Sequence, residues 1–182
     1  MSYYILYSKT GHEMTTIQHI RKHLRGEHFK IDFAIMKKEM INLQKGARIT
    51  KTYNALPGYI FVRTEDKLNS DTLRKMLSAD NTYFFLHYPD GSLELQRDDE
   101  RFAIGVFELP KVITADNVFI RNGDQVEITS GAFTSLRGKV IRIDRRRSRV
   151  DVSLMFMERE MKLSLPFNDI TVRNEEKQET SE

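Results

Sequence analysis

The 182-residue chain contains no cysteine and no tryptophan. Without cysteine the protein can form neither a disulfide framework nor a metal site with thiolate ligands, and this composition is typical of the reducing cytoplasm. No apolar run approaches the roughly 20 residues that a membrane-spanning helix needs. The first residues also lack the positive segment and apolar core of a secretion signal. We therefore expect a cytoplasmic protein without a membrane segment.

The sequence also lacks the short motifs of common enzymes. It contains no Gly-x-x-x-x-Gly-Lys phosphate loop, no Gly-x-Gly-x-x-Gly fingerprint and no Gly-x-Ser-x-Gly elbow. His19 and His23 have a spacing that suits a metal on a helix, but no Glu stands between them as a metalloprotease motif requires. Asp98, Asp99 and Glu100 lie at an expected helix start, where they favour the helix dipole. We expect no enzyme activity, no metal and no cofactor.

Positive charge is concentrated toward the C-terminal end of the chain, whose formal net charge is +3. Residues 119–173 hold eleven Lys or Arg against seven Asp or Glu, whereas residues 174–182 hold four Glu and one Lys. The final segment therefore has the composition of a disordered acidic tail. Residues 119–173 carry a net positive charge, which would attract a polyanionic partner.

Four arginines fall within five positions at 145–149. Clustered guanidinium groups offer planar, bidentate donors to phosphates, and we favour an RNA-binding site here over a charged turn that merely keeps the domain soluble. No aromatic side chains are clearly interleaved with these arginines, so a base-stacking platform is not evident. The candidate RNA-binding residues are Lys139, Arg142, Arg145, Arg146, Arg147 and Arg149.

The first hundred residues alternate between strand and helix patterns. The order fits a ferredoxin-like α+β sheet with its helices on one face. The expected strands cover residues 3–7, 31–36, 59–62 and 82–88, and the expected helices cover residues 12–25, a segment capped by Asn69 or Ser70, and residues 97–108.

Residues 37–55 interrupt this pattern with five Lys or Arg and one Glu. We interpret the segment as an exposed loop or a basic hairpin. It either contacts nucleic acid or polymerase, or is a flexible charged connection. The candidate nucleic-acid residues of this loop are Lys37, Lys38, Lys45, Arg48 and Lys51.

The pattern changes after Pro110, and we predict a linker over residues 109–118. Short alternating strands with closely spaced turns follow, which is typical of a small all-β barrel. These strands are expected at residues 124–129, 138–143, 150–156, 161–165 and 169–172. The predicted domains are therefore residues 1–108, a barrel over residues 119–173 and a tail over residues 174–182.

Three segments resemble the NusG family in the family's order. Tyr3–Glu13 resembles the strand and Gly-x-Glu helix start of the family's N-terminal (NGN) domain, and Leu56–Val62 resembles its Pro-Gly-Tyr strand. Residues 123–133, followed by Gly138-Lys139-Val140, resemble the KOW motif of an SH3-like barrel. The resemblance implies an NGN domain joined to a KOW barrel.

The resemblance further implies a monomeric processivity factor that docks on the clamp helices of the RNA polymerase β′ subunit and uses its barrel for RNA or another partner. From the residues alone, strand aromatics are usually core. Because side chains alternate along a strand, we expect one of the pairs Tyr59/Phe61 and Ile60/Val62 to be core and the other to be available. The candidate polymerase-binding residues are Tyr7, Leu56, Pro57, Tyr59 and Phe61.

Phe156–Met161 stands where the housekeeping member carries Phe-Gly-Arg, and Ala132 stands where proline is usual. With the run of arginines, these departures resemble specialised antiterminators of the LoaP or RfaH type. Two alternatives stay open: the housekeeping elongation factor, and an RNA-binding KOW protein without a polymerase role. The β-branched strands and turn glycines favour a stable barrel over a C-terminal domain that refolds as helices.

Overall fold

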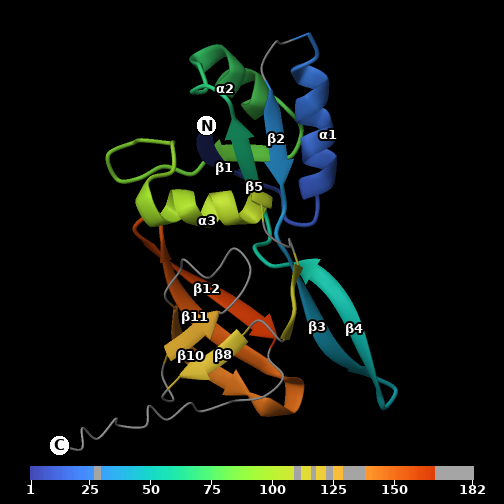
Figure 1. The fold of residues 1–182 in the computed structure, drawn as a ribbon. Helices are drawn as coiled ribbons and strands as arrows, with labels where there is room; N and C mark the ends of the chain where they lie inside the picture. Colours follow the sequence, from blue (N-terminus) through green and yellow to red (C-terminus); the bar gives the residue numbers. More distant parts are fainter. Residues whose placement is uncertain (27–29, 109–111, 116–117, 122–124, 129–137, 167–182) are drawn as a thin grey trace, which may run out of the picture.

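The computed structural model describes all residues except 27–29, 109–111, 116–117, 122–124, 129–137 and 167–182. An α/β layer lies above a β-barrel, and a long hairpin projects beside them (Figure 1). The predicted strand at residues 169–172 and the predicted tail at residues 174–182 lie outside the described residues. In the described part, no helix is long and apolar enough to cross a membrane.

The upper layer contains a four-stranded antiparallel sheet in the order β2-β5-β1-β6. Strand β1 lies inside the sheet and is buried along nearly all of its length, as its aromatic and aliphatic sequence predicts. The strands are β1 (Ser2–Ser8), β2 (Ile31–Ala34), β5 (Tyr59–Thr64) and β6 (Thr82–Phe85).

Helices cover both faces of this sheet. Apolar residues of α1 and α2 form one cluster with Tyr4 and Leu6, whereas Phe102 of α3 belongs to the cluster of Tyr3 and Ile5. The expectation that all helices share one face is therefore wrong. The reason is that β1 is apolar at consecutive positions, so both of its faces must be shielded from water. The helices are α1 (Glu13–His23), α2 (Ser70–Leu77) and α3 (Arg97–Glu108).

Two local signals place the helices as expected. Asn69 caps α2, because its side chain accepts a hydrogen bond of 2.8 Å from the Thr72 amide. Helix α3 covers residues 97–108, as predicted, and Asp98, Asp99 and Glu100 lie in its first turn.

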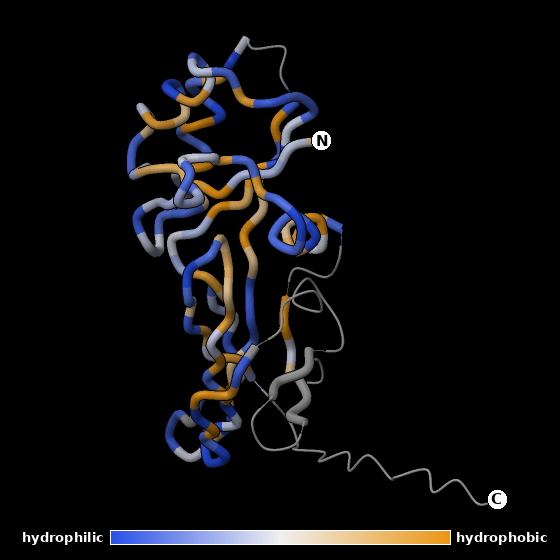
Figure 2. Tube along the Cα trace, turned by 90° about the vertical axis from the view of Figure 1, so that its left-hand side faces the viewer, coloured by the Kyte–Doolittle hydropathy of each residue, from blue (hydrophilic) through white to orange (hydrophobic). Residues whose placement is uncertain are grey.

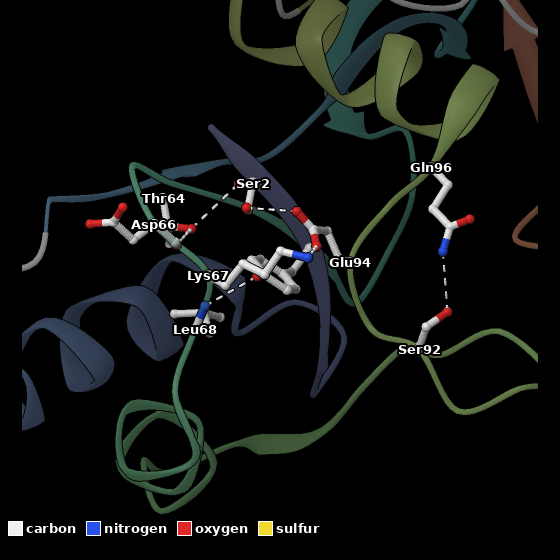
Figure 3. A network of polar contacts seen from close by, with 9 residues as sticks. Ser2, Thr64, Asp66, Lys67, Leu68, Ser92, Glu94 and Gln96 are labelled. Atoms are coloured by element: carbon white, nitrogen blue, oxygen red, sulfur yellow. Dashed lines mark hydrogen bonds and ion pairs between the residues drawn. The ribbon is translucent and has the colours of Figure 1, made fainter.

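A polar network ties the segment before α3 to the sheet (Figure 3). Glu94 accepts a hydrogen bond of 2.7 Å from the Ser2 hydroxyl and lies 2.7 Å from Lys67 Nζ. The Leu95 amide donates to the Tyr3 carbonyl at 2.8 Å. These contacts fix where α3 starts, and hence how it covers the lower face of the sheet.

The basic segment before the Pro-Gly turn forms a hairpin, which was one of its two predicted structures. Lys45 and Gly46 make a two-residue turn with φ of 50° and 81°, and the flanking residues Gln44 and Ala47 pair directly. Positive φ at both turn positions is the geometry that matches the twist of a tight hairpin. The hairpin strands are β3 (Lys37–Gln44) and β4 (Ala47–Asn54), and the short β7 (Val112–Ile113), within the predicted linker, pairs parallel to β3.

The lower layer is a five-stranded antiparallel sheet in the order β12-β11-β10-β9-β8. Strand β8 includes Val118, which the sequence pattern placed in the linker. The strands are β8 (Val118–Arg121), β9 (Gln125–Ile128), β10 (Gly138–Asp144), β11 (Arg149–Phe156) and β12 (Arg159–Pro166), and a 3-10 turn, η3 (Arg145–Arg147), joins β10 to β11.

The two layers share one hydrophobic core. The ring of Phe102 lies 5.5 Å from that of Phe61 and 5.4 Å from that of Phe156, both edge-to-face. Buried residues of β11 and β12 therefore continue the cluster that begins on the sheet, and apolar stretches run through both layers (Figure 2). Lys38 Nζ adds a polar contact by donating to the Ser164 carbonyl at 2.7 Å.

Candidate functional site

An aromatic cluster surrounds Tyr7 near the end of β1. The Tyr7 ring lies 5.3 Å from Tyr59, 5.4 Å from Phe84 and 5.9 Å from Tyr83. Strand pairing explains the first two contacts, since Tyr7 stands opposite Tyr59 on β5 and Phe84 on β6. These four residues are called the aromatic face below.

The outer half of the aromatic face is open to solvent. Tyr83 is 55% exposed and Phe84 is 48% exposed, whereas Tyr7 and Tyr59 are half-buried. Sequence reasoning missed the two exposed rings, because strict alternation along β6 would place one of them on each side of the sheet. A register shift between Tyr7 and Ser8 interrupts the β1–β6 pairing, and such irregularities re-aim side chains.

The other candidate polymerase-binding residues are placed differently. Leu56 and Phe61 are 3% and 0% exposed and belong to the core shared by the two layers, whereas Pro57 is exposed. Ile60 and Val62 are also fully buried, in the opposite cluster. The expectation that either Tyr59/Phe61 or Ile60/Val62 lies open at the surface is therefore wrong in this arrangement. The reason is that α3 and the barrel cover the face of the sheet that carries Phe61.

Gly58 explains why a Pro-Gly-Tyr turn and a Gly-x-Glu helix start occur together. Its amide donates a 2.7 Å hydrogen bond to Glu13 Oε1, and its carbonyl accepts one of 2.7 Å from the Ser8 amide. Its φ is +86°, and a Cβ there would lie 2.7 Å from a Tyr7 ring carbon and 2.9 Å from the Ser8 carbonyl. The turn therefore supports Tyr7 from behind.

Glu13 is 2% exposed, yet its carboxylate is well satisfied. Burial raises the pKa of this carboxyl, but hydrogen bonds from the Gly58, Glu13 and Gly11 amides and the Asn54 side chain outweigh that effect and hold the pKa below its ordinary value. Because the folded pKa is depressed, ionised Glu13 stabilises the fold above its unfolded pKa. That contribution is lost as pH falls through the folded pKa.

We expect Glu13→Gln to lower the free energy of unfolding by about 1–3 kcal/mol at pH 7, since a charged acceptor is lost. The difference from wild type should shrink below about pH 4, because wild type then loses the stability that ionised Glu13 provides, whereas the glutamine side chain does not titrate. Urea unfolding at a series of pH values measures this. A difference that does not change with pH would contradict the assigned role of the ionised carboxylate.

The hairpin of β11 and β12 lies against the aromatic face. Together they enclose a pocket of about 180 Å³. Arg159 lines this pocket and also donates to the His87 carbonyl at 3.3 Å. The barrel therefore partly covers Tyr7 and Tyr59. The pocket is lined by Tyr7, Tyr59, Phe84 and Leu86 of the upper layer and by Phe156, Arg159, Glu160 and Met161 of the barrel.

The turn of this hairpin is the stretch that departs from Phe-Gly-Arg. Met157 and Glu158 both have positive φ, of 49° and 59°, although neither is glycine. Met157 is 1% exposed, and its amide donates to Asp99 Oδ2 at 3.1 Å. Asp99 also accepts a 2.7 Å hydrogen bond from the Tyr88 hydroxyl. Burial of the side chain and the bond to Asp99 offset the backbone cost, of about 1–2 kcal/mol per non-glycine residue in this region.

The predicted loop residues lie in two environments. Four are exposed to solvent, and one lies where the hairpin meets the barrel. Lys37, Lys45, Arg48 and Lys51 are exposed, whereas Lys38 is half-buried and bonded to Ser164. Burial lowers the pKa of Lys38, and the positive charge of Arg149 lowers it further. Lys38 therefore connects the hairpin to the barrel in this structure.

The structure brings part of both basic segments together. Arg48 of the hairpin and Arg146, Arg147 and Arg149 of the barrel line one hollow of about 380 Å³, which is called the basic hollow below. Lys139, Arg142 and Arg145 do not line it. Sequence spacing could not predict this meeting, because Arg48 is about a hundred residues away from the others.

His19 and His23 of α1 contact two different residues just after the C-terminal end of α2. His19 Nδ1 lies 3.3 Å from Asp80 Oδ2, and His23 Nδ1 lies 3.1 Å from the Ser78 hydroxyl. Among the residues that the structure describes, no three His, Asp or Glu side chains gather as a metal site would require. His28 lies outside the described residues.

Comparisons with known proteins match both layers. Residues 1–99 match the family described as "Transcription termination factor nusG", and residues 122–152 match the KOW motif. The chain is 22% identical to the transcription termination/antitermination protein NusG of Buchnera aphidicola subsp. Baizongia pistaciae, with 92% of this chain and 94% of the relative covered. The same protein of Buchnera aphidicola subsp. Acyrthosiphon pisum is also 22% identical, with the same coverage.

Among solved structures, "Domain interaction in Thermotoga maritima NusG" aligns with a TM-score of 0.55 and 19% identity, covering 91% of this chain and 93% of that chain. This likeness agrees with an NGN domain followed by a KOW barrel. Because the family match spans more than half of the chain, the protein belongs to the NusG family of transcription termination and antitermination factors.

Proposed function

We propose that this protein docks on RNA polymerase through the aromatic face and acts as an elongation or antitermination factor. The observation that carries the proposal is the exposure of Tyr83 and Phe84 beside Tyr7 on a rigid sheet edge. Exposed aromatic groups of this kind mark interaction sites, and tyrosine is a frequent energetic anchor in protein interfaces.

The partner surface that suits this face is a pair of exposed helices, such as the clamp helices of the polymerase β′ subunit. A helix needs apolar anchors presented by a rigid groove or sheet, and four clustered rings on β1, β5 and β6 supply them. We expect the protein to dock as a monomer in the cytoplasm, without membrane contact. No bond is made or broken, so the protein acts by binding and not as an enzyme.

Docking over Tyr7 and Tyr59 requires the barrel to move away first. In this structure the β11–β12 hairpin covers the inner half of the aromatic face and closes the 180 Å³ pocket against it. The arrangement seen here is then a closed form, and the docked form has the barrel released. A ligand that binds one of the two forms better shifts the balance between them.

A specialised antitermination role is favoured over the housekeeping role by the β11–β12 turn. The residues that replace Phe-Gly-Arg there are engaged inside the molecule, through buried Met157 and its bond to Asp99. The exposed arginines of η3 give the barrel a surface suited to RNA instead. We propose that the barrel contacts RNA while the aromatic face contacts polymerase.

Binding to purified core RNA polymerase tests the docking surface. Tyr83→Ser and Phe84→Ser should each weaken binding about 10-fold or more, because they remove exposed anchors with little effect on the core. Met14→Ser is the matched control, since Met14 is 59% exposed on α1, which covers the opposite face of the sheet. Equal binding by all four proteins would reject the aromatic face, and no binding by wild type would favour the plain RNA-binding alternative.

A further inference from the structure

The basic hollow is built by the β3–β4 hairpin and the barrel. The β3–β4 hairpin contributes Arg48, and the turn between β10 and β11 contributes Arg146, Arg147 and Arg149. Among the described residues that line the hollow there are four arginines and no carboxylate. The hairpin and the barrel lie side by side in Figure 1, and arginines from these two segments, which are distant in sequence, line the same hollow.

Local structure holds the arginine turn in place. Asp144 Oδ1 accepts a hydrogen bond of 3.0 Å from the Arg147 amide, and Ser148 adopts the left-handed conformation with φ of 49° and ψ of 51°. The Ser148 amide closes the turn by donating to the Arg145 carbonyl at 3.3 Å. The nearest ion pair, Arg147 Nε to Asp144 Oδ2 at 3.9 Å, is long and leaves the Arg147 side chain 67% exposed. The turn is thus ordered while its charges remain open to a ligand.

Arg149 connects the turn to the hairpin. Its Nη2 donates to Asn42 Oδ1 at 2.9 Å, and Asn42 Nδ2 is in turn bonded to the Tyr53 hydroxyl at 2.9 Å, which fixes the orientation of the amide. Arg149 Nε is shielded from solvent and has no hydrogen-bond partner among the described residues. Lys38 lies close enough for repulsion by Arg149 to lower its pKa, after the larger effect of burial and against the opposing effect of the Asp151 carboxylate. The site therefore gathers more positive charge than the protein itself compensates.

We propose that the basic hollow binds the phosphodiester backbone of a nucleic acid, with hairpin and barrel arginines contacting the same strand. Guanidinium groups match phosphate oxygens in a bidentate fashion, and they supply the donors that the hollow leaves unused. No aromatic side chain is among the described residues that line the hollow, so the contact is to the backbone and not to stacked bases. This site rests on the proposed RNA contact of the barrel and extends it to the hairpin, whereas polymerase docking uses a different surface.

Nucleic-acid binding at this site favours the closed form. Because the hollow exists only while the barrel rests against the hairpin, a bound nucleic acid stabilises the arrangement in which the barrel is not released. The coupling is reciprocal, so docking that separates the layers weakens the nucleic-acid site. RNA and duplex DNA share the phosphodiester chemistry, and binding measurements with each distinguish these two sources.

Fluorescence anisotropy with a labelled RNA hairpin and a labelled DNA duplex tests the site on the full chain. At about 50 mM salt, Arg48→Gln and Arg146→Gln should each weaken binding about 3–10-fold and reduce the slope of log affinity against log salt by about 0.7–0.9. Arg74→Gln is the matched control, because Arg74 is an exposed arginine on α2, at the far end of the molecule.

Asn42→Ala tests whether the hairpin and the barrel act together, because it breaks the bond to Arg149 without changing any charge. It should also weaken binding about threefold or more, whereas Thr52→Ala on exposed β4 should not. Loss with Arg146→Gln alone would mean that the barrel binds by itself and would overturn a site shared by the hairpin and the barrel. No loss with any variant would overturn phosphate binding here. The assay contains no polymerase, so neither result bears on docking.

Discussion

Gly58→Ala is expected to lower the free energy of unfolding by about 2–5 kcal/mol. The backbone at Gly58 has φ of +86°, which costs a residue with a Cβ about 1–2 kcal/mol. The new Cβ would also lie 2.9 Å from the Ser8 carbonyl, a backbone atom of the central strand that cannot move aside. Overpacking of this kind adds about 1–3 kcal/mol.

Gly91→Ala is the matched control. Gly91 has nearly the same φ, +84°, but no atom lies within 4 Å of the position of its Cβ. The variant therefore carries the backbone cost alone, about 1–2 kcal/mol. Urea unfolding followed by far-UV circular dichroism compares the two variants. Equal losses for the two would contradict the close packing of Gly58 against β1. If Gly58→Ala folds, weaker polymerase binding is expected, since Tyr7 must shift.

Phe156→Ala should lower stability by about 3–5 kcal/mol and release the barrel from the upper layer. Phe156 is 3% exposed and its ring packs edge-to-face on Phe102, which packs in the same way on Phe61. Removing a buried phenyl group leaves a cavity at the junction, and the edge-to-face contact adds to the loss. Small-angle scattering should show a larger radius of gyration than wild type.

Met155→Ala is the control for this variant, because Met155 is the neighbouring residue of β11 and is 61% exposed. Its stability should lie within about 0.5 kcal/mol of wild type. A Phe156→Ala protein that unfolds and scatters like Met155→Ala would show that the junction does not depend on this ring. A released barrel should also raise the affinity for polymerase, because the inner half of the aromatic face is then uncovered.

Much of the fold could be predicted from local sequence patterns. The alternation and apolar runs placed most strands and all three helices within a few residues, and the amide cap at Asn69 is where the sequence suggested. The tight turn at Lys45-Gly46 was harder to predict, because glycine is typical of a position with positive φ but lysine is not. Strand β8 was missed because it follows directly on a segment interrupted by Pro110.

The candidate site was harder to predict, because it depends on contacts between segments far apart in the chain. Residue type alone could not tell that Phe61 is covered on the side that faces the barrel, or that Tyr83 and Phe84 are both exposed through a shift in strand register. The proximity of Arg48 and Arg146 depends likewise on how the barrel lies against the hairpin. Such contacts are tertiary, and no local period encodes them.

We propose that this protein acts on transcribing RNA polymerase through the aromatic face. In vitro transcription with purified polymerase, on a template with an intrinsic terminator, tests it most directly. Saturating wild type should raise the fraction of full-length transcript, and Phe84→Ser should remove that effect while Met14→Ser retains it. An unchanged transcript pattern with wild type, or an equal effect of wild type and Phe84→Ser, would contradict the claim.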